Sequence, residues 1–341
     1  MSTPSEDDLR ALARRLAEEA RHAGPAVEHV RRFGDARLRL CVTGRALADL
    51  LEALGGRPTQ APPDGCIRLW ERPPGAPPVP WREHDLGPRG LVRRPGAPGE
   101  THAAVNEPHA LTLVDVPARE VLWRSEAAAE LPWWERAAPL RPALFWALAG
   151  PGRGLVHAGA VGDERGAVLL AGPGGSGKTT VALAAAADGM RYVADDYLLI
   201  EAGPPARAVN LFTTAKLDAG HLARFPALAR RARRSADPVD GEKYVLPMPQ
   251  DALATELVVR AVAVPQIAGP RTAVRSISGA AALLALAPST AMQMPYDGGA
   301  VLATLASVVR GLPCFALEVG EDPADLAPAV DEMLERTAVP V

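Results

Sequence analysis

Residues 172–179 combine glycines, a lysine and a threonine in a spacing that suits phosphate binding. The run Gly172-Pro173-Gly174-Gly175-Ser176-Gly177-Lys178-Thr179 fits G-x-x-x-x-G-K-[ST] completely, between an apolar stretch and a helical one. Glycines let backbone N–H groups turn inward around an anion, and the following helix adds partial positive charge. We therefore expect a nucleotide phosphate site, with ATP and Mg²⁺ as cofactors. The expected nucleotide-binding residues are Gly172, Gly174, Gly175, Ser176, Gly177, Lys178, Thr179 and Thr180.

Two of these side chains have specific expected roles. Lys178 would reach the β- and γ-phosphates, and the Thr179 hydroxyl would ligate Mg²⁺. The same segment also fits the dinucleotide pattern G-x-G-x-x-G, with acidic residues about 20 positions on. The lysine and threonine after the last glycine disfavour that alternative, because a dinucleotide-binding helix packs closely on its sheet there. The hairpin expected before the loop also disfavours it.

Two adjacent carboxylates and an upstream histidine could complete a catalytic site. Asp195 and Asp196 end an apolar strand 17 residues after Lys178, and His157 lies in the apolar segment that leads toward the loop. Adjacent side chains on a strand point to opposite faces, so the two acids need different roles unless the backbone breaks there. One would handle Mg²⁺ and the other would accept the proton of an attacking hydroxyl. His157 is either a core histidine or an active-site group.

The elements that must position these residues read as a hairpin, a loop and a helix. We expect strands over 155–161 and 167–171 joined by a glycine-flanked turn, then a helix over 178–187 that Gly189 stops, then a strand over 192–200. Hairpins mixed with helices favour an α/β domain with a mixed sheet. The further strands expected are 208–214, 258–264, 273–277 and 314–319, and the further helices are 217–233, 279–287, 298–310 and 323–336.

The first 150 residues differ in composition and contain no clear catalytic constellation. All six tryptophans lie before residue 150 and all four tyrosines after residue 190, which suggests a boundary at the Gly-Pro-Gly of 150–152. We therefore expect an α+β accessory or recognition domain over 1–150 and the catalytic domain over 151–341. The elements expected in the first are a capped helix that begins after Ser5, strands over 37–40, 66–70, 110–116 and 120–123, a helix over 45–54 and a loop over 72–100.

Composition excludes several classes of protein. A formal net charge of −3 argues against a nucleic-acid binder that relies on bulk electrostatics. The three cysteines have no spacing that suits zinc or a disulfide scaffold, which indicates a reducing compartment. The charged N-terminus lacks an apolar signal region, and the sequence has no apolar run of 18 residues. We expect a cytoplasmic protein with no membrane or nucleic-acid partner. Whether it forms a homo-oligomer is left open.

The chain uses arginine almost everywhere that it needs a cation. Only Lys178, Lys216 and Lys243 are lysines among 37 basic residues, and all three follow residue 150. Codon bias explains such a ratio, but lysine is also kept where a compact ammonium group is needed. Lys216 and Lys243 could approach the γ-phosphate. The arginines crowded over 224–234 are either a solvated helix face or a patch for an acidic substrate.

Three motifs together resemble the catalytic core of the HPr kinase/phosphorylase family. They are His157-Ala158-x-x-Val161, the glycine loop 172–179, and Gly189-Met190-Arg191-Tyr192-Val193-Ala194-Asp195-Asp196. The likeness is greatest to the divergent relatives beside ribosomal-peptide biosynthesis genes, which include kinases of lasso-peptide precursors. It covers about 155–200, with a weaker continuation to the C-terminus. The resemblance implies a fold related to phosphoenolpyruvate carboxykinase, with a mixed sheet.

The resemblance also implies roles. Asp195 matches the acid/base carboxylate, Asp196 the metal-side acid, and His157 the histidine close to the transferred phosphate. The implied function is an ATP-dependent kinase of a serine on a ribosomally made precursor peptide or small protein. The Arg-x-x-Gly-Ile-Ile signature of true HPr enzymes is missing, so HPr is not the expected substrate. A small-molecule hydroxyl kinase and a non-catalytic nucleotide-dependent switch remain alternatives.

Overall fold

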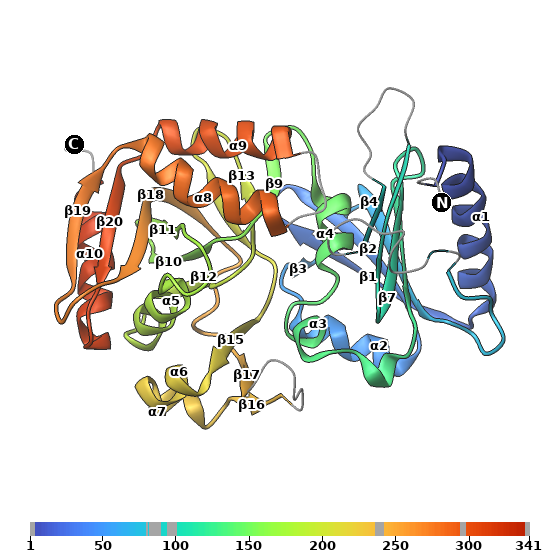
Figure 1. Ribbon diagram of the computed structural model, residues 1–341, viewed down its shortest axis with the longest axis horizontal. Helices are drawn as coiled ribbons and strands as arrows, with labels where there is room; N and C mark the ends of the chain where they lie inside the picture. Colours follow the sequence, from blue (N-terminus) through green and yellow to red (C-terminus); the bar gives the residue numbers. More distant parts are fainter. Residues whose placement is uncertain are drawn as a thin grey trace. The chain divides into compact units, whose positions relative to one another are not determined.

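The computed structural model describes residues 4–79, 81, 90–93, 101–235, 242–293 and 298–337. Among these residues, those up to Ala149 form one unit and those from Gly150 onward form a second. We call them unit 1 and unit 2 and describe each by itself. Both combine a large mixed sheet with helices (Figure 1).

The sheet of unit 1 is mixed. Its strand order is β3-β1-β2-β4-β8-β7-β6-β5, parallel at the pairs β2–β4 and β4–β8. The elements are α1 (Glu6–His22), β1 (Ala26–Phe33), β2 (Ala36–Thr43), α2 (Arg45–Ala48), η1 (Asp49–Ala53), β3 (Arg57–Pro58), β4 (Gly65–Glu71), β5 (Leu91–Arg93), β6 (His102–Glu107), β7 (Ala110–Asp115), β8 (Glu120–Ser125), η4 (Ala128–Glu130), α3 (Trp133–Ala137) and α4 (Arg141–Leu148).

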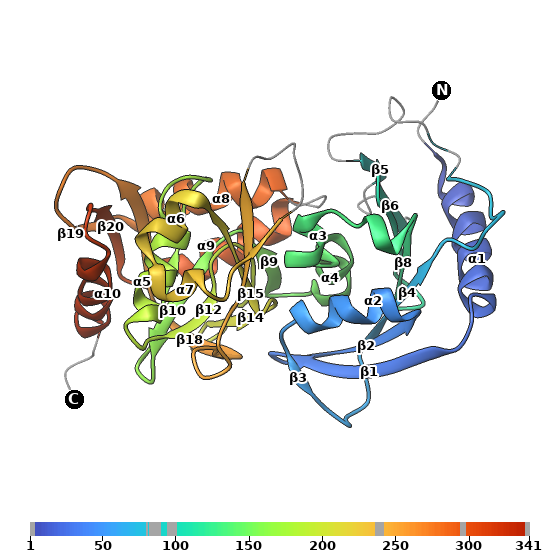
Figure 2. The same ribbon diagram turned by 90° about the horizontal axis from the view of Figure 1, so that it is seen from below.

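The helix α1 forms as the sequence predicts. Ser5 caps it, because the Ser5 hydroxyl accepts from the backbone N–H of Asp8 and the Asp8 carboxylate accepts from the N–H of Ser5. Its leucines recur at helical spacing, and Leu9 and Leu16 pack with Trp70 of the sheet. Figure 2 shows α1 on one side of this sheet, with α2 and α4 on the other side.

Other expectations for unit 1 need correction in detail. The strands expected at 37–40, 66–70, 110–116 and 120–123 are found in β2, β4, β7 and β8. The helix expected over 45–54 is instead the short α2 followed by the 3₁₀ turn η1. The loop expected over 72–100 lies largely outside the described residues and includes the strand β5.

Unit 2 is built on a second mixed sheet. Its strand order is β12-β10-β11-β18-β14-β13-β9, with β20 and then β19 added beside β18. A small separate sheet has the order β15-β17-β16. The elements are β9 (Arg153–Val156), β10 (Gly159–Asp163), β11 (Gly166–Leu170), α5 (Lys178–Ala187), β12 (Arg191–Ala194), β13 (Leu198–Glu201), β14 (Arg207–Asn210), β15 (Thr214–Asp218), α6 (Ala219–Arg224), α7 (Pro226–Ala229), β16 (Arg233–Arg234), β17 (Lys243–Pro247), β18 (Glu256–Ile267), β19 (Ala273–Ile277), α8 (Gly279–Gln293), α9 (Gly298–Arg310), β20 (Cys314–Val319), η5 (Pro323–Asp325) and α10 (Leu326–Glu335).

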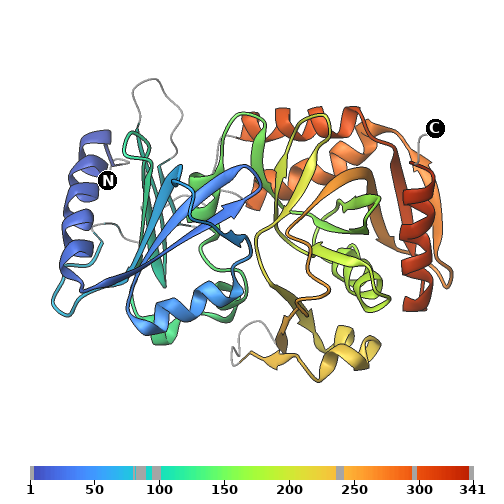
Figure 3. The ribbon, with the colours of Figure 1, turned by 180° about the vertical axis from the view of Figure 1, so that it is seen from behind.

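The long strand β18 joins two halves of this sheet. Its first residues pair with β14, and its later residues pair with β11 and β20 (Figure 3). One face of the β11 half packs against α5 and α10 in an apolar core that includes Val168, Leu183, Phe315 and Met333. The helices α8 and α9 pack near β18 and β9, respectively. Among the described residues, no helix is long and apolar enough to span a membrane.

Two strands that the sequence predicts as continuous are broken, and both breaks lie between the halves of the sheet. The strand expected over 155–161 is β9 and β10, which are separated at His157 and Ala158. The strand expected over 192–200 is β12 and β13, which are separated at 195–197. β9 pairs with β13 in one half of the sheet, while β10 pairs with β11 and β12 in the other half. The segments 153–163 and 191–201 must therefore each cross from one half to the other. The expected hairpin over β10 and β11 is confirmed.

The helix expected over 217–233 is also wrong. Leu217 lies on the strand β15, whose side chains alternate in burial, and Asp218 ends this strand and caps the short helix α6. Pro226 begins a second short helix, and the segment ends in β16. The expected strands 273–277 and 314–319 and the helix 298–310 have the predicted bounds. The strand expected over 208–214 is β14 with part of β15, and the helix over 323–336 is η5 with α10.

We predict that Glu6 stabilises unit 1 in a pH-dependent way. Burial would raise the pKa of Glu6, but hydrogen bonds from His102 and Thr101 lower it from 4.5 to about 2. An acid with a lowered pKa in the folded state stabilises the fold above its unfolded pKa and loses this effect as the pH falls toward the folded value. Glu6→Gln should therefore cost about 1–2 kcal/mol of unfolding free energy at pH 7, and the difference should shrink as the pH falls from 4.5 toward 2.

Urea unfolding followed by tryptophan fluorescence measures this effect, because every tryptophan lies before residue 150. Glu18→Gln, at an exposed position of the same helix, is the matched control. Equal urea midpoints for wild type and Glu6→Gln at pH 7 would contradict the prediction.

Candidate functional site

The glycine loop joins β11 to α5 along a path that requires glycine. Gly172, Gly175 and Gly177 have φ angles of 150°, 79° and 104°, a region that residues with side chains rarely adopt. A Cβ atom at Gly177 would also lie 3.2 Å from a methyl carbon of Val319. Substitution in the loop would therefore change both its conformation and its packing against β20.

The side chain of Lys178 folds back into this loop. Lys178 is the first residue of α5 and is 6% exposed. Its Nζ donates to the carbonyl oxygens of Gly172 at 2.7 Å and Pro173 at 2.9 Å. Burial lowers the pKa of Lys178, while the charges of Asp196 and Asp195 oppose this shift. The ammonium group is thus held where the motif expects phosphates to bind.

Asp195 is buried and contacts the predicted metal ligand. Its Oδ2 accepts from Thr179 Oγ1 at 3.1 Å, and its Oδ1 accepts from the hydroxyl of Tyr192 at 2.7 Å. Asp195 is 4% exposed and Tyr192 is fully buried. Burial and the neighbouring charge of Asp196 raise the pKa of Asp195, although its hydrogen bonds act in the opposite direction. Both oxygens of this carboxylate are occupied by the protein's own hydroxyl groups.

Asp196 has different partners. His157 Nε2 lies 2.8 Å from its Oδ1, and Lys216 Nζ donates to its Oδ2 at 2.6 Å. The ring of Tyr197 packs beside both partners. Burial would raise the pKa of Asp196, but the ammonium group of Lys216 and the hydrogen bond from His157 hold it well below its ordinary value. Its side chain is still 26% exposed, so an ionised carboxylate faces the solvent side of the site.

His157 is nearly buried and is held by its backbone as well as by its ring. It is 3% exposed, and its N–H donates to the hydroxyl of Thr290 on α8 at 3.1 Å. Its Nδ1 is buried and has no hydrogen-bond partner among the described residues. The ring therefore has a fixed position from which Nε2 reaches Asp196.

A second histidine connects α5 to α6. His221 Nε2 lies 3.2 Å from Thr180 Oγ1, and His221 Nδ1 lies 2.8 Å from Asp218 Oδ1. Asp218 also caps α6 by accepting from the N–H of His221. The pair thus attaches the first turn of α5 to the small sheet that carries Lys216.

A cavity of about 370 Å³ connects these groups. It reaches from the glycine loop to both aspartates and His157, and on the other side to His221 and Arg224. Nine predicted site residues line it: His157, Gly174, Gly175, Gly177, Lys178, Thr179, Thr180, Asp195 and Asp196. Gly172 and Ser176 do not line it, although Gly172 accepts from Lys178.

Sequence reasoning assigned no role to two of the residues that complete the site, Tyr192 and His221. It named Lys216 as a group that could approach the γ-phosphate, just before an expected helix, whereas Lys216 lies on the strand β15 and donates to Asp196. The rarity of lysine is the signal that points to Lys216. Lys243 lies opposite Asp218 on β17, and it does not line the cavity.

The arginine segment over 224–234 is divided between two environments. Arg224 lines the cavity and also donates to the carbonyl oxygens of Gly320 and Glu321. The side chains of Arg230, Arg231, Arg233 and Arg234 are exposed. Exposure is compatible with both interpretations of these four, a solvated face and a patch for an acidic substrate, although Arg233 and Arg234 lie on the strand β16 and not on a helix.

Comparisons with known proteins give only a distant likeness. No family model and no curated protein match the chain. Among solved structures, the chain is similar to the HPr(Ser) kinase/phosphatase from Coxiella burnetii, with 11% sequence identity and a TM-score of 0.28. The match covers 53% of this chain and 94% of that chain. At these values no residue's role can be transferred, so the motif resemblance to the HPr kinase/phosphorylase family stays a prediction.

We predict that Tyr192→Phe destabilises unit 2. The change removes a hydroxyl group that donates to a buried carboxylate, and an unsatisfied buried acceptor costs about 1–3 kcal/mol. Urea unfolding followed by circular dichroism measures the loss. Tyr244→Phe is the control, because the Tyr244 hydroxyl makes only a long 3.3 Å contact with an exposed glutamate. Equal losses for the two variants would contradict a specific role for the hydrogen bond.

Proposed function

We propose that unit 2 is a kinase that uses ATP and Mg²⁺ to phosphorylate a serine hydroxyl of a ribosomally made precursor peptide. The observation that carries the proposal is the cavity that joins the glycine loop to two differently partnered carboxylates. A phosphate-binding loop alone is compatible with a switch protein. An accessible carboxylate at the same cavity adds a group that can accept a proton, which is what transfer to a hydroxyl requires.

Binding of the triphosphate would involve the loop and Lys178. The backbone of the glycine loop offers N–H groups to the phosphates, and α5 adds its N-terminal partial charge. The Lys178 ammonium group would exchange its two carbonyl partners for phosphate oxygens, which are stronger acceptors for a cation. Thr180 on α5 and His221 on α6 line the cavity beyond this point and would contact the bound nucleotide.

The residues near Thr179 fit Mg²⁺. Thr179 Oγ1 and Asp195 Oδ2 are 3.1 Å apart, close to the roughly 3 Å between neighbouring oxygens around an octahedral ion with bonds of 2.0–2.1 Å. We therefore assign Thr179 and Asp195 to the metal side, which exchanges the two aspartate roles that the sequence resemblance implies. When bound, Mg²⁺ would neutralise charge on the phosphates.

Asp196 is then the base. It is the more exposed of the two carboxylates, and Lys216 holds it in the ionised form that a proton acceptor requires. The acceptor oxygen would form its bond to the γ-phosphorus as the bond to the ADP oxygen breaks, and its proton would go to Asp196. His157 orients the carboxylate through Nε2, and Lys216 balances its negative charge until the proton arrives. The acceptor class, a peptide serine, is supported by the motif resemblance.

We predict different losses for the two aspartate variants. Asp196→Asn should lower the rate of transfer by roughly 10²–10⁴-fold while ATP still binds, because the amide cannot accept the proton. Asp195→Asn should weaken nucleotide binding in the presence of Mg²⁺, with little change in its absence. Phosphoryl transfer and calorimetric ATP binding measure the two effects. Asp188→Asn, at an exposed position after α5, is the control.

The reverse result would restore the assignment from the sequence. If Asp195→Asn stops transfer without affecting Mg²⁺-dependent binding, then Asp195 is the base and Asp196 the metal-side acid.

A second prediction tests the reaction itself. Incubation with Mg-ATP and the peptides encoded beside this gene should add one phosphoryl group to a serine, as seen by mass spectrometry. Lys178→Ala should abolish the shift, because the triphosphate loses its cationic partner. Transfer to small hydroxyl compounds alone would identify a small-molecule kinase, and ATP binding without consumption would identify a switch protein. Either outcome would contradict the peptide kinase.

A further inference from the structure

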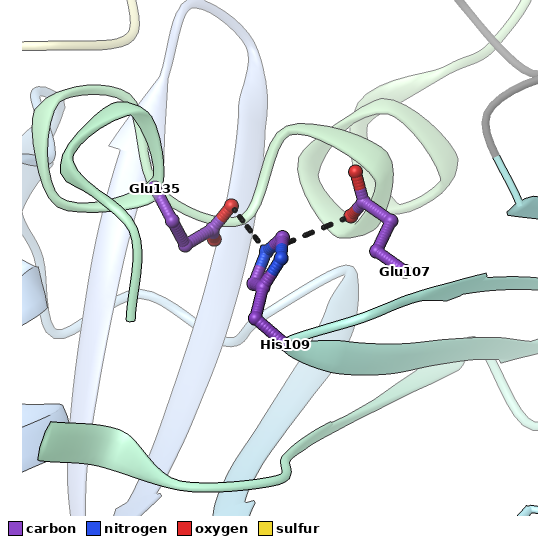
Figure 4. Close-up of side chains that lie close together, drawn as sticks. All are labelled: Glu107, His109 and Glu135. Atoms are coloured by element: carbon purple, nitrogen blue, oxygen red, sulfur yellow. Dashed lines mark hydrogen bonds and ion pairs between the residues drawn. The ribbon is translucent and has the colours of Figure 1, made fainter. Parts of the chain in front are cut away.

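Three side chains of unit 1 converge at one end of the β6–β7 hairpin (Figure 4). Glu107 ends β6, His109 lies in the turn before β7, and Glu135 comes from α3. His109 Nε2 is 3.4 Å from Glu135 Oε2 and 3.9 Å from Glu107 Oε2. The three ligand atoms all lie within 4.8 Å of one another. None of the three residues takes part in the site of unit 2, and nothing in the proposed kinase reaction uses them.

Glu135 is buried and His109 is partly buried, and contacts with neighbouring residues hold both side chains in place. Glu135 is 1% exposed, and its Oε1 accepts from the backbone N–H of Leu140 at 2.6 Å. Leu140 presents this N–H from a left-handed conformation, φ 63°, that a leucine rarely adopts. The His109 ring packs edge-on against Trp134. The other oxygen of Glu135 and the Nε2 atom of His109 are thus directed at each other, as outer hydrogen bonds direct metal ligands.

The direct hydrogen bond within the cluster, between His109 Nε2 and Glu135 Oε2, is long at 3.4 Å. A charge-assisted N–H···O bond is usually about 2.7–2.9 Å long, and one N–H can point well at only one carboxylate. Here Nε2 faces two carboxylates at 3.4 and 3.9 Å. A cation with bonds of 2.0–2.2 Å to nitrogen and oxygen separates tetrahedral ligands by about 3.3–3.5 Å, which matches the distance from His109 to Glu135 and would require Glu107 to move closer by a few tenths of an ångström. The gap is therefore of the size that a metal ion fills.

We propose that Glu107, His109 and Glu135 bind a divalent cation of the Zn²⁺ class. One imidazole and two carboxylates suit Zn²⁺ or Co²⁺ better than Mg²⁺ or Ca²⁺, which prefer sets made only of oxygen atoms. Three protein ligands leave a fourth position for water or another ligand. The ion would displace the proton from His109 Nε2, and it would cross-link the β6–β7 hairpin to α3.

Cobalt titration of the full chain tests this site, because the visible absorption of Co²⁺ depends on its coordination. The Asp195→Asn background removes the proposed metal-side carboxylate of unit 2, so that failure of this site and failure of the kinase proposal are distinguishable. We expect saturable binding of one Co²⁺, with the absorption of a low-coordinate ion, and displacement by Zn²⁺ but not by Mg²⁺.

Variants then identify the ligands. His109→Gln and Glu107→Gln should each weaken Co²⁺ binding at least tenfold. His29→Gln, at an exposed position of β1, should not. Circular dichroism of each variant checks that unit 1 remains folded, and Glu107→Gln, at a partly exposed position, is the variant least disturbing to the core. Equal Co²⁺ affinity in wild type and both ligand variants, or no saturable binding, would overturn the proposal.

Discussion

The Asp196 carboxylate is the point on which the arrangement of unit 2 depends. It keeps a negative charge in a mostly enclosed position, which requires partners with N–H groups close by. His157 reaches it from the end of β9, and Lys216 reaches it from the small β15–β17–β16 sheet. Removal of any one partner would leave polar groups unsatisfied, so the large sheet and the small sheet are coupled through one side chain.

The backbone meets this requirement by breaking two strands between the halves of the sheet. The chain leaves the ladder at His157 between β9 and β10, and again at 195–197 between β12 and β13. At the second break, Asn210 donates to the carbonyl oxygens of Val193 and Phe212, which satisfies groups that the ladder no longer pairs. In a regular strand, adjacent side chains point to opposite faces of the sheet, but this alternation does not hold where the strand is broken. Asp195 and Asp196 can therefore both line one cavity.

The two carboxylates share a cavity but differ in what surrounds them. Asp195 is bonded to neutral hydroxyl groups, and Asp196 is bonded to an ammonium group and an imidazole. Opposite pKa shifts follow from this difference. Pairs of acids with divergent environments are typical of sites that divide metal handling and proton transfer between two groups. In the cluster of unit 1, Glu135 is held in position by the backbone N–H of Leu140, and His109 is held by its packing against Trp134.

The sequence by itself determined the features that depend on local interactions. The glycine loop requires positive φ angles, α1 requires its capping box, and the β10–β11 hairpin requires its turn, and each of these is readable within a few residues. Only the tertiary structure decided the strand breaks, because they result from pairing with strands far away in the sequence. It also decided that Lys216 lies on a strand beside Asp196 and that Glu135 lies beside His109. The two residues of each pair are far apart in the sequence, so no local pattern could bring them together.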